Sequence, residues 1–100
     1  MKSEYQNYII NKMRRLREEH RYSQENIASL LGVCNGYIGN IESPKTSHKY
    51  TLSHIFKICN EFNYPIEQIF LEDEDYKTNI DIVSNVIKKI IRYEEQRADY

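Results

Sequence analysis

A chain of 100 residues, of which 29% are charged, is long enough for one small domain and an appended segment. No apolar run approaches the roughly 20 residues that a membrane span requires, and the sequence has no leader of the signal-peptide type. We therefore expect a cytoplasmic protein with reduced thiols, in which Cys34 and Cys59 are small, buried or half-buried helix residues.

Charge is distributed unevenly along the chain. Residues 1–70 carry nine basic and seven acidic side chains, whereas residues 71–100 carry five basic and eight acidic ones. This asymmetry separates a mildly basic head from an acidic tail. We place one domain over residues 1–71, and an acidic linker with a helix over residues 72–100. Because the head has few cations, tight binding of nucleic acid would need two copies of it.

Apolar residues recur at helical spacing along most of the chain, which predicts six helices, no strand and an all-α fold. Residues 43–50 are the only clear loop, and residues 72–75 are an acidic linker or the start of a helix. The predicted helices lie at about 4–19, at two short segments within 22–42, at about 52–62 behind Thr51 as N-cap, between Pro65 and Phe70, and at about 79–96. The predicted inward residues are Ile9, Met13, Leu16, Ile27, Ala28, Leu31, Ile38, Ile41, Leu52, Ile55, Cys59, Phe62, Ile69 and Phe70.

The two short helices within residues 22–42 are the most informative part of the chain. Ser23 is a suitable N-cap for the first helix, and Gly32 ends it because a left-handed residue is favoured at that position. Ile38 and Ile41 give the second helix an inner face. Its other side is small and amide-rich, which suits a DNA groove better than a protein core. The residues of that side are Asn35, Gly36, Tyr37, Gly39 and Asn40.

This segment resembles the helix-turn-helix of the phage-repressor and Cro family, also called the xenobiotic-response-element family of regulators. The resemblance covers roughly residues 9–70. It implies a five-helix, repressor-like DNA-binding domain, to which the chain adds a C-terminal amphipathic helix. The matching residues are Ser23-Gln24, Ile27-Ala28, Leu31-Gly32-Val33, Tyr37-Ile38 and Ile41-Glu42.

The resemblance implies a DNA contact for Gln24, because a helix N-terminus attracts a phosphate; the alternative is an ordinary surface residue. Asn35 and Asn40 can each reach a base edge, since Asn forms a bidentate pair with adenine. Tyr37 either contacts DNA or packs against the following loop. That loop either holds the backbone of the second strand or is simply solvated; its candidate residues are Lys45, Thr46, Ser47 and Lys49.

The resemblance also implies an ion pair between Arg17 in the first helix and Glu42 at the end of the recognition helix. Such a pair would fix the recognition helix against its domain. Removing one partner of a buried pair can cost about 3–5 kcal/mol. We interpret the pair as structural and not as a DNA contact.

The chain departs from the family at several positions. Gly36 and Gly39 remove side chains that would face the groove, so either the backbone approaches DNA closely or the helix reads few bases. Cys34 replaces the usual Ser or Thr cap, and Arg21 stands where the family often has Gly. These departures bear on sequence specificity more than on the fold.

The segment at about 79–96 lies outside the resemblance. Its eight apolar side chains span roughly half of the helix circumference, whereas an ordinary surface helix needs a stripe of about 100°. The wider arc favours two packing partners, its own domain and a second copy; the alternative is that the helix only lies across its own core. The residues expected on the opposite side are Asp81, Ser84, Asn85, Lys88 and Arg92. The predicted dimerisation residues are Ile80, Val83, Val86, Ile87, Ile90 and Ile91.

Together these observations predict a sequence-specific double-stranded DNA-binding transcriptional regulator, acting as a homodimeric repressor. The alternative is an antitoxin-like interaction module whose C-terminal helix binds a partner protein. Enzyme activity is not expected, because His20, His48 and His54 are scattered and the two cysteines lack a second close pair. We likewise expect no metal, no cofactor and no membrane partner.

Overall fold

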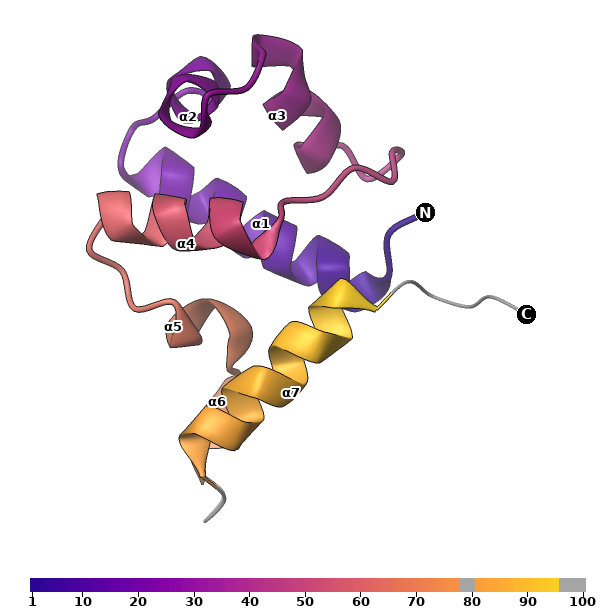
Figure 1. Ribbon diagram of the computed structural model, residues 1–100, viewed down its shortest axis with the longest axis vertical. Coiled ribbons are helices and arrows are strands. Elements are labelled where there is room, and N and C mark those ends of the chain that lie inside the picture. The colour runs from indigo at the N-terminus through magenta and orange to yellow at the C-terminus, as the bar shows by residue number, and fades with distance from the viewer. Residues whose placement is uncertain (78–80, 96–100) are drawn as a thin grey trace.

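The computed structural model describes residues 1–77 and 81–95, and this part of the chain is all-α, with helices and no strand. The helices are α1 (Glu4–Glu19), α2 (Gln24–Leu31), α3 (Asn35–Glu42), α4 (Leu52–Glu61), α5 (Glu67–Phe70), α6 (Asp73–Lys77) and α7 (Ile82–Glu94). In Figure 1, α2 and α3 lie together at one end of the molecule, α1 and α4 cross its middle, and α7 runs from the opposite end to the start of α1. α6 is a helix of five residues in the acidic segment, so the described residues contain one helix more than the six predicted.

Three helices begin at a capping box, and α7 begins at Asp81, whose side chain accepts a hydrogen bond from the backbone N–H of Val83. The predicted N-caps Ser23 and Thr51 are confirmed: Ser23 accepts a hydrogen bond from the backbone N–H of Asn26, and Thr51 accepts one from that of His54. In return, the side chains of Asn26 and His54 accept hydrogen bonds from the backbone N–H groups of Ser23 and Thr51, which completes a capping box in each case. α1 begins in the same way at Ser3. These starts are therefore determined by residues within one turn.

Three helices also end in the same left-handed turn. One residue just after the end of each helix has a positive φ: 60° at Arg21 after α1, 71° at Gly32 after α2 and 52° at Asn63 after α4. The prediction that Gly32 is left-handed is confirmed. Arg21 and Asn63 adopt the same conformation with a side chain, at a cost of about 1–2 kcal/mol for an ordinary L residue. The backbone bonds that close these turns run from Tyr22 to Arg17, from Val33 to Ala28 and from Tyr64 to Cys59, at 3.0, 3.0 and 2.9 Å.

The two cysteines have different environments. Cys59 is buried within α4, as expected. Cys34 is exposed, contrary to the expectation, because it is the N-cap of α3 and lies outside the helix. Its side chain makes no capping hydrogen bond. α3 therefore lacks the side-chain cap that α1, α2 and α4 possess.

The core is filled mainly by isoleucine from α1 to α5. The predicted inward residues are buried, except that Leu31, Leu52 and Phe62 are half-buried. Tyr50, which was not predicted, is 1% exposed, and Tyr93, which was counted in the apolar arc of the last helix, is 0% exposed. Since Tyr93 belongs to α7, the last helix contributes to the same core as α1–α5. The largest fully buried residues are Tyr50, Tyr93, Phe70, Ile9, Ile10, Met13, Ile27, Ile38, Ile41, Ile55, Ile58 and Ile69.

α7 packs against α1, α5 and α6 through a face that includes polar side chains. Asn85, which was expected on the solvent side, is buried, and its Nδ2 lies 3.5 Å from the carbonyl oxygen of Asp75. The ammonium of Lys89 lies 3.5 Å from the Asp75 carboxylate, and the guanidinium of Arg92 lies 4.5 Å from the ring centroid of Tyr5. The periodicity of apolar residues missed this arrangement because polar partners on α1 and α6 take the place of water.

Candidate nucleic-acid interface

α2 and α3 form a closely packed pair of eight-residue helices joined by the turn at Gly32. Ile27 and Ala28 of α2 are fully buried, as are Ile38 and Ile41 of α3. α3 therefore has an apolar inner face and a polar outer face. The residues of α3 that are exposed on its outer face are Asn35, Gly36 and Asn40.

A buried ion pair holds α3 on α1. Nε and Nη2 of Arg17 donate to the two carboxylate oxygens of Glu42, each at 2.9 Å. Nη1 of Arg17 donates to the carbonyl oxygen of Tyr22 at 2.8 Å. The Arg17 and Glu42 side chains are only 10% and 5% exposed, and the hydrogen bonds to Glu42 raise the pKa of the Arg17 guanidinium. The end of α3 is thus fixed in position and orientation.

Gln24, the first residue of α2, also reaches Glu42. Its Nε2 donates to Oε1 of Glu42 at 3.0 Å, so the side chain crosses from α2 to α3. The two glycines of α3 differ as a result. A Cβ atom at Gly39 would lie 3.4 Å from Oε1 of Gln24, whereas one at Gly36 would meet no described neighbour within 4 Å. The space over Gly36 is open, whereas the space over Gly39 is bordered by the carboxamide of Gln24.

The C-terminal end of α3 is capped by a lysine from the other end of the chain. The ammonium of Lys2 donates to the carbonyl oxygens of Ile41, Ser43 and His48 at 2.6, 2.8 and 2.8 Å. The Lys2 residue is 8% exposed, and burial lowers the pKa of its ammonium. A positive charge is favourable at a helix C-terminus. Sequence reasoning missed Lys2, because nothing in the pattern near residue 2 indicates a contact 39 residues away.

The loop after α3 presents only some of its predicted contacts to solvent. Lys45 and Ser47 are exposed. Thr46 is half-buried, and its hydroxyl donates to the carbonyl oxygen of Asn40, so it extends the cap of α3. The ammonium of Lys49 lies 3.7 Å from the carboxylate of Glu94 in α7. Lys45 and Ser47 are therefore available to a ligand, whereas Thr46 and Lys49 already have partners within the protein.

Tyr37 packs within the protein. It is half-buried, and its ring stands edge-on to the rings of His48 and His54, with centroids 6.3 and 6.1 Å apart. These contacts support the alternative in which Tyr37 packs against the loop. They leave Asn35 and Asn40 as the exposed amides of α3.

The outer surface of α2 and α3 is nearly neutral. These helices contain no basic residue, and their acidic residues are Glu25 and Glu42, of which Glu42 is paired with Arg17. The cations that flank them in sequence, Arg21 before α2 and Lys45 after α3, are both exposed. This distribution places hydrogen-bonding amides, and not cations, on the surface of the two helices. The positive charges stand in the segments that flank them in sequence.

α7 carries an exposed row of apolar residues, which we call the outer stripe. It consists of Val83, Ile87 and Ile91, which are 62%, 51% and 55% exposed and lie one turn apart. Of the other residues predicted for dimerisation, Val86 and Ile90 are half-buried, Ile90 against the core of its own domain, and Ile80 lies outside the described residues. In Figure 1, α7 begins at the end of the molecule opposite α2 and α3. A partner on this stripe would leave the α2–α3 surface free.

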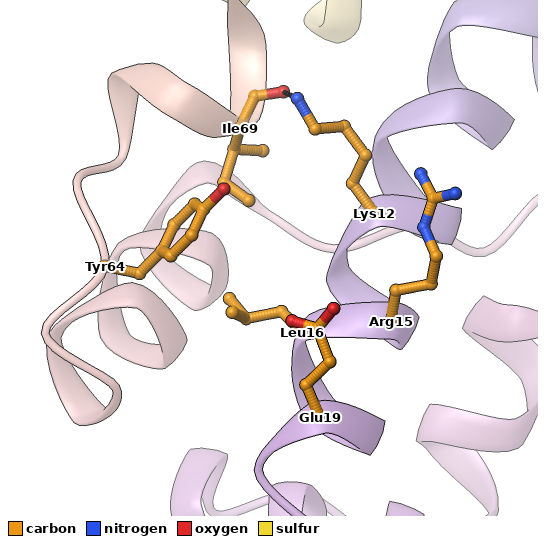
Figure 2. Close-up of a pocket in the computed structure, with 6 residues that line it drawn as sticks. All are labelled: Lys12, Arg15, Leu16, Glu19, Tyr64 and Ile69. Carbon is orange, nitrogen blue, oxygen red and sulfur yellow. Dashed lines mark hydrogen bonds between the residues drawn. The ribbon is translucent and has the colours of Figure 1, made fainter.

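A small pocket lies between α1 and the segment that contains Tyr64 and α5 (Figure 2). Its volume of about 140 Å³ is below the roughly 300–1,000 Å³ of typical small-molecule sites. Lys12 at its edge already donates to the carbonyl oxygens of Gln68 and Ile69, at 2.6 and 2.8 Å. We therefore assign this lysine to the C-terminal end of α5 and not to a ligand. The lining residues are Lys12, Arg15, Leu16, Glu19, Tyr64 and Ile69.

Comparisons with protein-family models, curated proteins and solved structures find no match to this chain. Within residues 1–77 and 81–95, no helix is long and apolar enough to cross a membrane. The same residues contain no group of three or more His, Cys, Asp and Glu side chains placed to hold a metal ion.

Proposed function

We propose that α2 and α3 form a helix-turn-helix and that the protein is a sequence-specific double-stranded DNA-binding transcriptional regulator. The observation that supports this most directly is the outer face of α3. It presents the exposed amides of Asn35 and Asn40 on a helix that the pair between Arg17 and Glu42 holds in place. A rigid helix with a small, amide-rich face can enter the major groove, which is about 12 Å wide. The succession of α1 to α5, with α2 and α3 as a closely packed pair of short helices, supports the proposal.

Asn35 and Asn40 are the proposed base readers from α3. The carboxamide of Asn can pair with N6 and N7 of adenine, and such a pair discriminates against a wrong base by about 1–3 kcal/mol. The two residues are separated by about 7.5 Å along the helix axis. This separation corresponds to about two base pairs of B-DNA.

The proposed phosphate contacts surround these readers. The first N–H groups of α2 have no partner within their helix, and a helix N-terminus attracts an anion. Lys45 and Ser47 are exposed in the loop after α3 and fit the backbone of the second strand. Lys49 joins them if a phosphate replaces Glu94 as its partner. Thr46 is better assigned to the cap of α3.

A second copy of the chain is the proposed partner for the outer stripe of α7. Two-fold pairs are the commonest assembly of identical chains. An antiparallel pairing centred on Ile87 would bring Val83 of one copy to Ile91 of the other. It would also set Glu94 and Glu95 beside the N-terminus of the partner's α7, where the helix dipole favours acidic groups. The apolar side chains of the stripe would thus meet one another in such a pair.

Such a dimer is expected to depend on concentration. α7 has 13 residues, so each helix contributes a contact only about 20 Å long. A single helix pair of this length falls short of the roughly 1,200–2,000 Å² that stable interfaces bury. DNA with two half-sites would therefore strengthen the assembly. A homodimeric repressor that occupies its operator only above a threshold concentration fits these properties.

Selection of bound fragments from random double-stranded DNA, followed by sequencing, tests the proposed function. We expect enrichment of a two-fold symmetric site. Asn35→Ala and Asn40→Ala should each lower affinity for that site by about 1–3 kcal/mol and relax preference at one base position. Lys45→Ala should weaken binding to all sequences alike and reduce the salt slope by about one unit. A pool that remains random after repeated rounds would contradict the proposal.

The outer stripe also favours a second candidate function, an antitoxin-like module that binds a different protein through α7. The size of the chain in solution separates the two functions. A monomer at every concentration, combined with a random DNA pool, would leave a heterologous partner as the occupant of the stripe.

A further inference from the structure

The carboxamide of Gln24 lies over Gly39 in α3. Gln24 is the first residue of α2, and its Nε2 donates to Oε1 of Glu42 at 3.0 Å. Gly39 lies three positions before Glu42, and a Cβ atom there would stand 3.4 Å from Oε1 of Gln24. A Cβ atom at position 39 would therefore be in van der Waals contact with the Gln24 carboxamide, and a larger side chain would compete with the carboxamide for space.

The anchor of this carboxamide is fixed. Oε1 of Glu42 accepts from Nη2 of Arg17 as well as from Nε2 of Gln24. The other oxygen of Glu42 accepts from Nε of Arg17. Because the Glu42 side chain is 5% exposed and bound at both oxygens, it holds Gln24 at a defined position, although Gln24 itself is exposed.

A carboxamide in this position has hydrogen-bonding capacity to spare. A glutamine side chain has two N–H donors and a carbonyl oxygen with two lone pairs, and the bond to Glu42 uses one N–H. One donor and the acceptor remain. These are the groups with which Gln pairs with N6 and N7 of adenine.

The position also places Gln24 beside a reader of α3. Asn35 lies four positions before Gly39, and residues four apart on a helix are neighbours on one face, about 5–6 Å apart. Asn35 and the carboxamide over Gly39 therefore form two amide groups one turn apart. One of them comes from α3, and the other comes from α2.

We propose that Gln24 is a specificity-determining residue, with Glu42 and Gly39 as its positioning residues. Glu42 orients the carboxamide, and Gly39 leaves room for it on the face of α3. The contact to DNA rests on the proposed function, whereas the positioning is a property of the free protein. In this proposal, glycine at position 39 makes room for the carboxamide of Gln24 from the neighbouring helix. It does not act by bringing the α3 backbone close to DNA.

The positioning is tested without DNA, by nuclear magnetic resonance of the side-chain amide groups. Gln24→Ala identifies the Nε2 signals by their loss. Gly39→Val should shift these signals towards those of a free glutamine, because valine adds two methyl groups beyond a Cβ atom that would already be in contact with the carboxamide. Gly36→Val is the matched control, since the space over Gly36 is open, and it should leave the signals unchanged. Gln24 signals that are unmoved by Gly39→Val would overturn the positioning.

The contact is tested on the selected DNA site. Gln24→Ala should weaken binding to that site by roughly 5- to 100-fold and relax one base position, with little change on random DNA. Gly39→Val should produce the same loss, and the double variant should lose no more than either single variant. Equal losses on the selected site and on random DNA would assign the carboxamide to a phosphate and overturn the inference. If the wild-type chain selects no site, the proposed function fails, while the resonance experiment still decides the positioning.

Discussion

Tyr93, near the end of α7, donates its hydroxyl hydrogen to the carbonyl oxygen of Tyr50 in the loop before α4, at 2.7 Å. The carbonyl oxygen of Tyr93 accepts in turn from Nε2 of Gln6 in α1, also at 2.7 Å. The same loop carries Lys49, which lies 3.7 Å from Glu94. The C-terminal helix is therefore joined to the segment that follows α3, for which we propose DNA contacts.

Replacing Tyr93 by Phe should reduce stability through a single lost hydrogen bond. The ring would keep its packing, but the buried carbonyl group of Tyr50 would lose its partner. An unsatisfied buried polar group costs about 1–3 kcal/mol, and urea unfolding followed by circular dichroism would measure this. Tyr76→Phe is the control, because Tyr76 is 46% exposed. Equal stabilities for the two variants would mean that the hydroxyl of Tyr93 contributes nothing.

Replacing Lys2 by Met should destabilise the chain and loosen the loop after α3. The ammonium serves three carbonyl oxygens, and a hydrogen bond to a charged group contributes about 1.5–3 kcal/mol. Thermal unfolding should show the loss, and amide exchange should accelerate over residues 43–48. Lys57→Met is the matched control, since Lys57 is exposed on α4. Unchanged exchange in the loop would show that the ammonium does not hold it.

Thiol chemistry should distinguish the two cysteines. Cys34 is exposed, whereas burial raises the pKa of the Cys59 thiol to about 11. A thiol reagent at pH 8 should label Cys34 rapidly and Cys59 only through unfolding. The folded chain retains the Cys59 proton above pH 9, where the unfolded chain loses it, so stability should fall as pH rises from about 9 to 11. Cys59→Ala should flatten this part of the stability profile, and an unaltered profile would contradict the assignment.

A hydroxyl at the start of α3 should stabilise the helix. Cys34 is its N-cap and makes no capping hydrogen bond, whereas a Ser at an N-cap contributes about 0.5–2 kcal/mol relative to a residue that cannot cap. Cys34→Ser should therefore raise the melting temperature, and Cys34→Ala should not. A Ser variant no more stable than the Ala variant would show that the geometry at residue 34 does not permit capping.

Charge placed on the outer stripe should separate two copies of the chain. Ile87→Glu buries a carboxylate at the centre of the proposed contact, so sedimentation should show monomers at concentrations where the wild-type chain is dimeric. Ser84→Glu adds the same charge to the same helix and should have a smaller effect. Because Ile87 is 51% exposed, neither variant is expected to unfold the domain. A dimer that withstands Ile87→Glu would place the interface elsewhere.

The parts of the fold that the sequence predicted depend on residues close to one another in the chain. Ser23 and Thr51 start helices because their hydroxyls reach N–H groups three positions later. Gly32 ends α2 for a reason confined to its own backbone. The burial of Ile38 and Ile41 follows from a spacing of three residues. Such signals are contained in a short window, so they can be interpreted without the fold.

The parts that could not be predicted depend on contacts across the chain. Lys2 reaches a carbonyl group 39 residues away, and Gln6 reaches one 87 residues away. Asn85 is buried where its side chain faces the carbonyl oxygen of Asp75. The spacing of apolar residues in the sequence does not indicate this contact. The position of Gln24 over Gly39 requires the angle between α2 and α3. At the candidate site, the sequence therefore indicated the residue types but not their partners.

The burial of Tyr93 among residues of α1 and α5 also determines when the core can be completed during synthesis of the chain. Its ring stands 6.0 Å from that of Phe70, which the ribosome completes 23 residues earlier. At about 5–20 residues per second, the nascent helices wait roughly one to five seconds for the ring that closes their core. During this interval the hydroxyl of Tyr93 is not yet available to the carbonyl oxygen of Tyr50, so the segment after α3 lacks one of its hydrogen bonds. Unfinished chains are therefore expected to be poor competitors for the ligand of the finished protein.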